Sequence, residues 1–567
     1  MRMNTDQNHV DLVFVWHMHQ PDYRQSTDGD YLLPWTYLHA IKDYTDMVAH
    51  LERFPSVHAV VNFVPILLEQ IEDYAAQIAN ARLRDPLLRL LVDPDLSALN
   101  SAARRHAVDA CFRSNHVHMV TPFPAYRRLH EIYHVLAPQE DSALMYLSAQ
   151  FFADVVTWYH LAWMGETERR RQPFLAELMA KGQGFTLEDR RCLLALIGDV
   201  LTNLVPRYRA LADRGQIELT TTPHAHPLGP LLIDFQSARE AIPDIPLPRA
   251  TGYPGGRQRF DSHLERALAS HAERFGRPAQ GVWPAEGALS EAVLGRLAAY
   301  GVNWTATGEA VLAHTLARAG QTYVRAEDLY HPWRSNAGVT VLFRDDRLSD
   351  LIGFEYAKWH GQDAAHHFIA ELEAIRKAAP SDKTPLVCVI LDGENAWEHY
   401  PYNAYYFFDD LYRLLASHPM IRTTTLSAAL AGDHAGLTAP RLPQLVCGSW
   451  VYGTLSTWIG DADKNQAWDL LCAAKLSYDL VVGSGRLDAA ALTAVEERLR
   501  ACEGSDWFWW FGDYNPAQAV SSFDRLYRHN LAALYLALGL AVPAQVEVPI
   551  SHGGGDAEGG GTMRRSA

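Results

Sequence analysis

The sequence has few cysteines and no long apolar run. Its six cysteines are scattered over 567 residues, and none belongs to a CxxC pair or a closely spaced set. This spacing argues against a disulfide framework, so we expect buried, reduced thiols in a reducing compartment. The longest apolar stretch, residues 531–542, is shorter than the roughly 18 residues that a membrane-spanning helix needs.

A recognisable secretion signal is also lacking. The only early apolar run, residues 12–16, is flanked by Asp6 and Asp11 and is too short for the apolar core of a signal peptide. We therefore expect a cytoplasmic protein without a membrane partner.

The chain has no excess of positive charge. Its 50 Lys and Arg residues are outnumbered by 66 Asp and Glu residues, which leaves a formal net charge of −16. Nucleic acids and anionic membranes would be repelled by such a surface. An uncharged polymer such as a glucan would not be.

Short, continuous apolar runs recur through the first three quarters of the chain. Runs of this kind are typical of parallel strands that are buried on both faces, and helical patterns such as 289–300 and 366–378 separate them. The succession predicts an α/β fold with a parallel barrel or a doubly wound sheet. The predicted strands are residues 12–16, 59–63, 217–220, 281–283, 302–306, 339–343 and 386–391.

The pattern divides the chain into three parts. Residues 1–430 form the predicted catalytic domain, with a helical insertion at about 125–215. Residues 431–545 have apolar positions at helical spacing and predict an α-helical domain that completes the cleft. The Gly-rich segment 546–567 is predicted to be a disordered tail.

Two acidic residues follow predicted strands beside tryptophans. Glu286 lies in the segment 283–287, and Asp392 ends the apolar run 386–391. A pair of carboxyl groups in an aromatic-lined cleft is what cleavage of a glycosidic bond requires. Glu286 by itself would more often be a helix-capping acid, and the pairing with Asp392 favours the catalytic interpretation. Glu394 lies two residues after Asp392, so repulsion is expected to raise at least one of their pKa values.

Histidines and tryptophans are further candidates. His17 and His19 alternate at the exit of the first predicted strand, and His226 follows the third. In (β/α) barrels, active sites collect at the carboxyl ends of the strands, which favours a site role for the pair. An isolated histidine such as His226 is more often structural, and most tryptophans belong to cores. The predicted substrate-binding residues are His17, His19, His226, Trp283, Glu394, Trp397, Trp450, Trp458, Asp506 and Trp509.

These segments together resemble glycoside hydrolase family 57, in particular its amylopullulanase-like and bacterial α-amylase-like members. The matching segments are residues 17–23, 215–219 with 226–227, 283–287, 392–400, 448–450 with 458–460, and 505–512. The resemblance implies a (β/α)7 barrel followed by a helical bundle, and retaining cleavage of α-glucosidic bonds without cofactor or metal. Glu286 falls on the nucleophile position of the family and Asp392 on its general acid/base. His-Ala at 224–225 departs from the aromatic residues that relatives often carry there.

Three hypotheses remain open at this stage. The first is a retaining hydrolase of α-glucans such as starch, glycogen or maltodextrin, acting on α-1,4 and possibly α-1,6 bonds, with a 4-α-glucanotransferase or branching enzyme as the alternative in the same family. The second is a barrel metallohydrolase, such as a deacetylase or zinc mannosidase, with His17, His19 and Asp392 as ligands. The third is a glycan-binding protein without activity, against which the presence of both acids argues.

Overall fold

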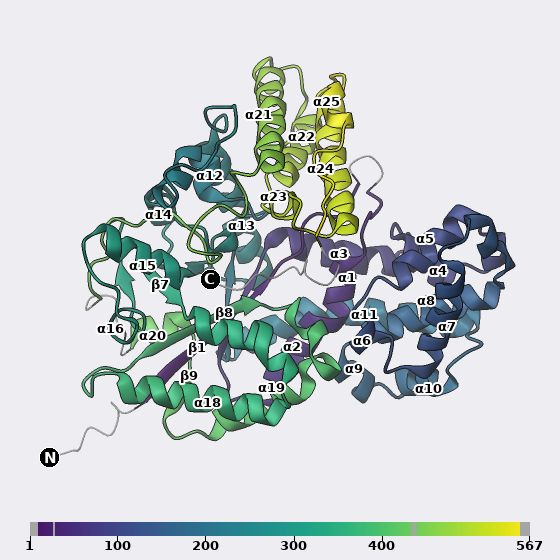
Figure 1. Cartoon of the computed structure of the whole chain (residues 1–567), viewed down its shortest axis with the longest axis horizontal. Helices are drawn as coiled ribbons and strands as arrows, with labels where there is room; N and C mark the ends of the chain where they lie inside the picture. Colours follow the sequence, from purple (N-terminus) through teal and green to yellow (C-terminus); the bar gives the residue numbers. More distant parts are fainter. Residues whose placement is uncertain (1–8, 26–28, 433, 435–438, 556–567) are drawn as a thin grey trace.

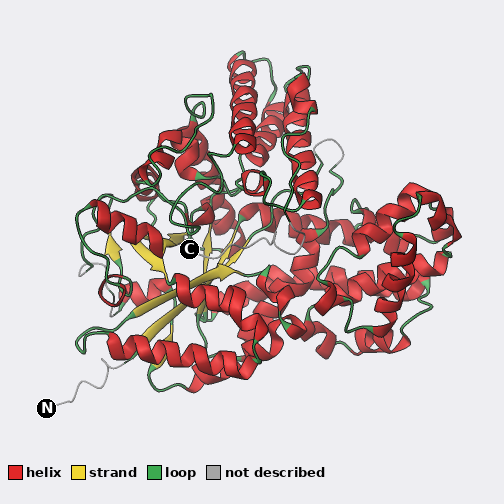
Figure 2. Cartoon of the chain, in the orientation of Figure 1, coloured by secondary structure: helices red, strands yellow, loops and turns green. Residues whose placement is uncertain are grey.

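Seven parallel strands close into a barrel surrounded by helices (Figures 1 and 2). The computed structural model describes residues 9–25, 29–432, 434 and 439–555. Each of the seven predicted apolar runs overlaps one barrel strand, so the predicted α/β barrel is confirmed. In order around the barrel, the strands are β1 (Val10–Met18), β2 (Ala59–Phe63), β3 (Ile217–Thr221), β4 (Gly281–Val282), β5 (Trp304–Gly308), β7 (Thr340–Arg344) and β8 (Leu386–Asp392).

Two short strands lie outside this ring. β6 (Trp333–Arg334) pairs antiparallel with β7, and β9 (Ile421–Thr423) pairs parallel with β1. The nine residues of β1 are long enough to pair with β9 at their start and with β2 at their end, while β8 pairs along most of the other edge. Strands of two or three residues are too short to show an apolar pattern, which is why the sequence did not predict them.

Alternation along β1 separates the barrel lumen from the outer layer. Val13 and Val15 pack with Ile390 inside the barrel, whereas Phe14 and Trp16 belong to the core between the strands and the helices. Successive residues of a strand point to opposite faces, so His17 continues the lumen side at the carboxyl end of the strand.

Eleven described α-helices lie around the barrel, and their amphipathic sequences cover the outer faces of the strands. They are α1 (Trp35–His39), α2 (Thr45–Arg53), α12 (Gly229–Ile233), α13 (Gly256–Phe275), α14 (Glu291–Ala299), α15 (Glu309–Arg318), α16 (Arg325–Asp328), α17 (Asp346–Asp350), α18 (Gly361–Ala378), α19 (Tyr405–Ser417) and α20 (Leu426–Ala431).

A helical insertion between β2 and β3 projects to one side of the barrel (right in Figure 1). It begins well before the predicted residue 125, because the helices that follow β2 already belong to it. The 27-residue helix α11 returns the chain to β3, and a capping box at Thr186 and Asp189 starts that helix. The helices of the insertion are α3 (Pro65–Ala79), α4 (Pro86–Val92), α5 (Ser101–Cys111), α6 (His116–Met119), α7 (Pro124–Leu136), α8 (Ala149–Trp163), α9 (Glu166–Arg171), α10 (Pro173–Lys181) and α11 (Leu187–Asp213).

The C-terminal helices stand above the barrel in Figure 1 and are anchored to α13 through a buried glutamate. Glu503 accepts hydrogen bonds from Arg259 Nε at 2.7 Å, from His263 Nε2 at 2.8 Å and from the Tyr253 hydroxyl at 2.6 Å. Although burial opposes it, the Arg259 guanidinium holds the pKa of Glu503 well below its usual range. The helices are α21 (Ala462–Gly483), α22 (Ala489–Cys502), α23 (Asp506–Trp510), α24 (Ala517–Ala537) and α25 (Ala544–Glu547).

The start of the predicted tail is ordered. The sequence predicted disorder from residue 546, but Ile550 and Ser551 are buried, and the Ser551 hydroxyl accepts a hydrogen bond from the Gly512 amide at 3.0 Å. These contacts offset the conformational entropy that a Gly-rich composition would otherwise favour. Residues 556–567 lie outside the described part of the chain.

All six cysteines are free, as predicted, but only five are buried, because Cys192 is exposed on α11. A search of the described helices finds none with the length and apolar character needed to cross a membrane.

Candidate active site

The carboxyl ends of three neighbouring strands bring polar side chains together at one level of the barrel. In the β-sheet register, His17 of β1 lies beside Asn62 of β2 on one edge and beside Asp392 of β8 on the other. All three side chains continue the lumen side of their strands, whose deeper positions are apolar residues such as Val15 and Ile390. The barrel therefore places a polar cluster on top of an apolar plug.

Glu286 lies in a tight turn that follows β4. Its backbone is left-handed, with φ 60° and ψ 20°, a conformation that costs a non-glycine residue about 1–3 kcal/mol. Both side-chain oxygens accept hydrogen bonds, Oε1 from Ser505 Oγ at 3.0 Å and Oε2 from Trp450 Nε1 at 3.2 Å. The Glu286 carbonyl also accepts from the Trp450 amide at 3.1 Å. The turn thus holds this carboxyl group in one orientation.

Burial raises the pKa values of both candidate acids, and neighbouring negative charge adds to the shift of Glu286. Desolvation raises the pKa of Glu286 to about 8, and the negative charges of Asp506 and Asp392 act in the same direction. Desolvation also raises the pKa of Asp392 to about 6, against an opposing hydrogen bond from the Asn395 amide. Between pH 6 and 8 the pair of acids therefore holds about one proton.

The three histidines form one stacked cluster. His17 Nε2 and His226 Nε2 lie 3.1 Å apart, and the ring of His19 stacks on that of His226 with a centroid distance of 3.9 Å. Desolvation lowers the pKa of His17 to about 3 and that of His226 well below its usual range, so both rings are neutral near pH 7. His226 has a left-handed backbone, with φ 59°, which turns its ring into the cluster. The structure thus brings together the three histidines that the sequence singled out.

The loop before α23 carries the C-terminal helices into this cluster. The Ser505 amide donates to the His226 carbonyl at 2.8 Å, and the Ser505 hydroxyl lies 2.7 Å from His226 Nδ1. Asp506 Oδ1 lies 2.8 Å from His19 Nε2. A Cβ added at Gly504 would lie 2.9 Å from the Ala225 carbonyl oxygen, so this close approach requires glycine.

Sequence reasoning missed Ser505 and Asn62. Asn62 is an uncharged polar residue within an otherwise apolar strand, on its lumen side, and that exception was a usable signal. Its Oδ1 lies 2.6 Å from His17 Nδ1 and accepts from the Thr222 hydroxyl at 2.9 Å. Ser505 carried no such signal, because serines before a short helix are common caps.

Glu394 lies behind the candidate acids. It is only 1% exposed, and Oε1 accepts from the His19 amide at 3.2 Å and from Gln20 Nε2 at 3.4 Å. Desolvation, together with the nearby Asp392, raises the pKa of Glu394 well above its usual range. In this structure Glu394 supports the segment that carries His19.

The predicted tryptophans occupy different layers. Trp283 is fully buried and packs edge-to-face on Trp450, with ring centroids 5.3 Å apart. Trp509 retains 8% exposure and lies 5.8 Å from the ring of Trp458, which is itself fully buried. Among these four, Trp450 is the most exposed, and it donates directly to Glu286.

Trp397 requires a correction. It was predicted to contact substrate, but it packs on the outer face of the barrel against Trp16 and Phe408, and its indole N–H donates to the Gly393 carbonyl at 2.9 Å. The loop after β8 turns outward at this point, so Trp397 buttresses the Asp392 segment from behind. Trp458 also has a packing role in this structure, because no part of its ring is exposed.

Within the described residues, one trio of side chains approaches closely enough to share a metal ion: His19, His226 and Asp506. His19 Nε2 already pairs with Asp506, and both nitrogens of His226 face Ser505 and His17, whereas the buried His19 Nδ1 has no hydrogen-bond partner among the described residues. This trio differs from the ligand set considered for a metallohydrolase, since Asp392 and His17 are not part of it.

Comparisons with known proteins agree on one family. The sequence model described as Glycosyl hydrolase family 57 matches residues 13–440. No curated protein has a significantly similar sequence.

Solved structures share the fold at low identity. The GH57-type branching enzyme of Pyrococcus horikoshii is 15% identical, with a TM-score of 0.57 over 95% of this chain and 93% of that chain. The α-amylase AmyC of Thermotoga maritima is 12% identical, with a TM-score of 0.56 over 95% of each chain. The 4-α-glucanotransferase of Thermococcus litoralis is 15% identical, with a TM-score of 0.51 over 93% of this chain and 60% of that chain.

Proposed function

Because this chain belongs to glycosyl hydrolase family 57, we propose that it is a retaining enzyme that cleaves α-glucosidic bonds of an α-glucan by double displacement. The observation that carries the proposal is the pair of acids at the carboxyl ends of the barrel strands, the buried Glu286 and the half-buried Asp392. The negative charge of Asp392 raises the pKa of Glu286, so the two carboxyl groups lie close enough to interact, as a catalytic pair requires.

In the first step, the Glu286 carboxylate attacks the anomeric carbon while the Asp392 carboxyl group protonates the departing glycosidic oxygen. The bond from the anomeric carbon to that oxygen breaks, and a glycosyl ester forms on Glu286. In the second step, Asp392 takes a proton from water or from a sugar hydroxyl, whose oxygen displaces Glu286. The hydrogen bonds to both oxygens of Glu286 hold it ready for attack.

The pKa values put the shared proton mostly on Glu286 in the free enzyme, because its pKa of about 8 exceeds the value of about 6 for Asp392. Turnover then uses the minority arrangement, with the proton on Asp392. By their pKa values alone, Glu286 would be the general acid and Asp392 the nucleophile. The assignment of Glu286 as nucleophile follows the resemblance of its segment to the family.

Side chains around the acids are proposed to bind the sugar nearest the cleaved bond. His17 and His226 present neutral imidazole rings, and His19 and Asp506 present polar groups that can exchange hydrogen bonds with sugar hydroxyl groups. Trp450 and Trp509 offer the partly exposed aromatic faces against which a sugar ring stacks.

The α-glucan substrate class is supported by the named activities of the similar structures, which are a branching enzyme, an α-amylase and a 4-α-glucanotransferase. Hydrolysis is the leading activity, and transfer to another sugar is the alternative. Both start from the same glycosyl ester, so the identity of the acceptor separates them.

Product analysis on maltoheptaose, amylose and pullulan tests this proposal. Hydrolysis increases the number of reducing ends, whereas transfer redistributes chain lengths at a constant number of reducing ends. Branching in addition creates linkages that a debranching enzyme removes. If none of these α-glucans is altered by protein that is folded by calorimetry, the proposed function is wrong.

A further inference from the structure

A chain of four hydrogen bonds links the Glu286 carboxyl group to the side-chain amide on β2. Its contacts measure 3.0, 2.7, 3.1 and 2.6 Å, and in order it joins Glu286, Ser505, His226, His17 and Asn62. All the linking atoms are buried. Burial also keeps both imidazoles neutral by lowering their pKa values, so each ring donates at one nitrogen and accepts at the other.

The single proton of the Ser505 hydroxyl decides the direction of the chain. When Asn62 Oδ1 accepts from His17 Nδ1, His17 Nε2 must accept from His226. His226 Nδ1 must then accept the Ser505 proton. Ser505 has no second proton for Glu286, so Glu286 must bring its own. The hydrogen bonds can therefore run in this direction only when the Glu286 carboxyl group is protonated.

An ionised Glu286 requires every bond to point the other way. The Ser505 hydroxyl then donates to the carboxylate, and the proton of each imidazole moves to its other nitrogen. At the far end the Asn62 amide makes a half turn and donates through Nδ2, an atom without a hydrogen-bond partner in the first arrangement. Both directions leave every link with one donor and one acceptor, and after the half turn the Thr222 hydroxyl, which first donates to Asn62 Oδ1, accepts from Nδ2 instead.

We propose that the hydrogen bonds between Glu286 and Asn62 all reverse their donor and acceptor roles when Glu286 gains or loses its proton. Ser505 and Asn62 are then positioning residues for the Glu286 carboxyl group. The consequence of this reversal for turnover rests on the proposed function, but the reversal itself does not. Asp392 on β8, Asp506 on α23 and His226 after β3 also face Glu286. One residue further away are His17 on β1, which contacts His226, and Arg344 on β7, whose guanidinium lies over the Trp450 ring.

Nuclear magnetic resonance of ring-labelled histidines tests the reversal without substrate. As pH rises through the pKa of Glu286, His17 should change from the Nδ1–H to the Nε2–H tautomer, and His226 should change in the opposite sense at the same midpoint. Variants lacking either histidine assign the signals. Constant tautomers from pH 5 to 9 overturn the proposal, whether or not the protein acts on glucans.

Two variants separate positioning from mere packing. Ser505→Ala breaks the chain, so the tautomer change should disappear. The pKa of Glu286 should rise by about one unit, because an ionised carboxylate loses a donor. Trp450→Phe removes the donor on the other oxygen and should shift the midpoint while the coupled change persists. A coupled change that survives in Ser505→Ala, at near-native melting temperature, also overturns the proposal.

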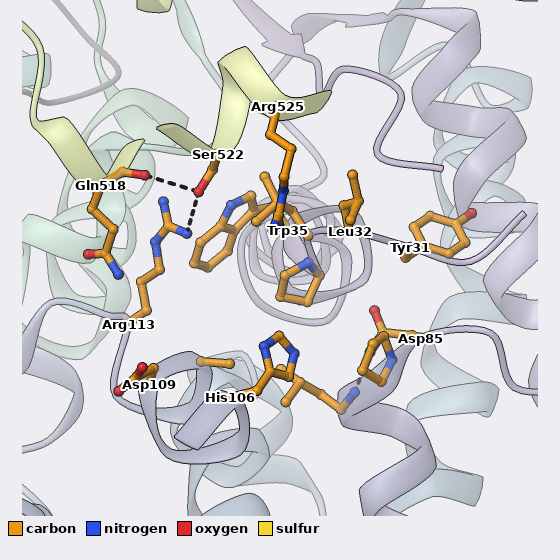
Figure 3. Close-up of a pocket in the computed structure, with 15 residues that line it drawn as sticks. Tyr31, Leu32, Trp35, Asp85, His106, Asp109, Arg113, Gln518, Ser522 and Arg525 are labelled. Atoms are coloured by element: carbon orange, nitrogen blue, oxygen red, sulfur yellow. Dashed lines mark hydrogen bonds between the residues drawn. The ribbon is translucent and has the colours of Figure 1, made fainter. Parts of the chain in front are cut away.

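A second inference concerns a cavity outside the candidate active site. A cavity of about 160 Å³ lies between the segment 31–35, the insertion helix α5 and the C-terminal helix α24 (Figure 3). None of the residues described above as the candidate active site lines it. It lies where two separate helical parts of the chain meet.

Two guanidinium groups line this cavity, and no carboxylate of the described residues pairs with either. Arg113 lies over the Trp35 ring at 5.4 Å from the centroid and donates to the Ser522 hydroxyl at 3.3 Å. Arg525 lies one turn after Ser522 on the same face of α24. In the described part of the chain, neither arginine forms an ion pair, and desolvation lowers the pKa of Arg113. Arg113 is half-buried, where a cation without a counter-ion is costly unless an anion joins it, whereas Arg525 is exposed at the cavity rim.

The two acids in the lining are engaged elsewhere. Asp85 accepts from the amides of Leu87 and Leu88 at the start of α4 and from the Tyr74 hydroxyl at 2.9 Å. Burial raises its pKa to about 6, so part of its charge is neutralised near that pH. Asp109 accepts from the Tyr133 hydroxyl on the neighbouring helix. Within the described residues, neither acid therefore pairs with a guanidinium group of the cavity.

We infer that this cavity binds a small phosphorylated sugar, its phosphate between the two guanidinium groups and its ring against Trp35. Planar guanidinium forks match phosphate oxygens, and an indole face suits the apolar side of a sugar ring. The volume leaves room for one such ring rather than for a glucan chain.

Isothermal calorimetry with glucose 1-phosphate, glucose and inorganic phosphate tests the inference independently of any activity. The sugar phosphate should bind in one equivalent, more tightly than either fragment. Arg525→Gln should weaken it at least tenfold, whereas Arg128→Gln, which removes the same charge from the exposed side of α7, should not. Equal affinity for inorganic phosphate, no binding, or unchanged binding in Arg525→Gln overturns the inference.

Discussion

Ser505 Oγ lies 3.0 Å from Oε1 of Glu286, although 219 positions separate the two residues in the chain. One residue comes from the turn after a barrel strand and the other from the loop that enters α23. The C-terminal helices are thus part of the candidate active site and not an appended domain. Their anchor, Glu503, lies only two residues from this contact.

The first prediction concerns the variant Glu286→Gln. It should lower kcat/KM at least about 10³-fold, because a catalytic nucleophile is lost while the volume is kept. A carboxyl group whose pKa is raised from 4.5 to about 8 in the folded state destabilises the fold above pH 4.5, and fully so above pH 8. The melting temperature of the variant should therefore exceed that of the wild type at pH 8 and match it near pH 4. Retained activity would remove Glu286 from the mechanism.

Azide distinguishes the roles of the two acids. With an activated α-maltoside, Asp392→Ala still forms the ester on Glu286, and azide should displace it to give an α-glycosyl azide. Glu286→Ala cannot form the ester, so azide should attack directly and give the β-glycosyl azide. Nuclear magnetic resonance of the products reads the configuration. The opposite pairing of variant and product would exchange the two roles.

The pH profile of kcat/KM should be bell-shaped, with limbs near pH 6 and pH 8. Below the lower value both acids are protonated, and above the higher value both are ionised, so the required single proton is present only between them. Asp506→Asn removes a negative charge that raises the pKa of Glu286, so the alkaline limb should move to lower pH. A limb that stays in place or moves to higher pH contradicts this electrostatic account.

Activity should survive exhaustive treatment with EDTA. Among the described residues, the side chains that could share a metal ion, those of His19, His226 and Asp506, already form hydrogen bonds with one another or with Ser505 and His17. The check is kcat/KM before and after chelation, with metal content measured on the same sample. Loss of activity that zinc restores would favour the metallohydrolase hypothesis instead.

Trp509→Phe tests whether the C-terminal helices contact the sugar. The substitution keeps most of the aromatic volume, so the melting temperature should fall by only a few degrees, whereas KM for maltoheptaose should rise several-fold as the stacking face shrinks. Trp458→Phe is the matched control, because that ring is fully buried beside Trp509 and should change stability but not KM. Equal effects of both variants on KM would confine Trp509 to a packing role.

Particular elements show how far sequence reasoning reached. The continuous apolar runs identified all seven barrel strands, since a strand that is buried on both faces is mostly apolar along its whole length. The carboxyl-end rule then led to His17, His19, His226, Glu286 and Asp392, which the structure gathers in one cluster. Trp397 was misplaced, because composition does not reveal which way a loop turns after its strand. The insertion was predicted too short, because α3 and α4 follow β2 without a break in pattern.

The sequence by itself determined the barrel, the helical C-terminal part and the residues at the strand ends, because periodicity and strand termini are local properties of the chain. Only the tertiary structure decided the partners of those residues. The contacts of Glu286 with Ser505 and Trp450 join segments more than 160 positions apart. The raised pKa values follow from burial and from neighbouring charges, which exist only once those segments have packed together. The types of catalytic residue could therefore be recognised from the sequence, whereas their pKa values depend on the tertiary structure.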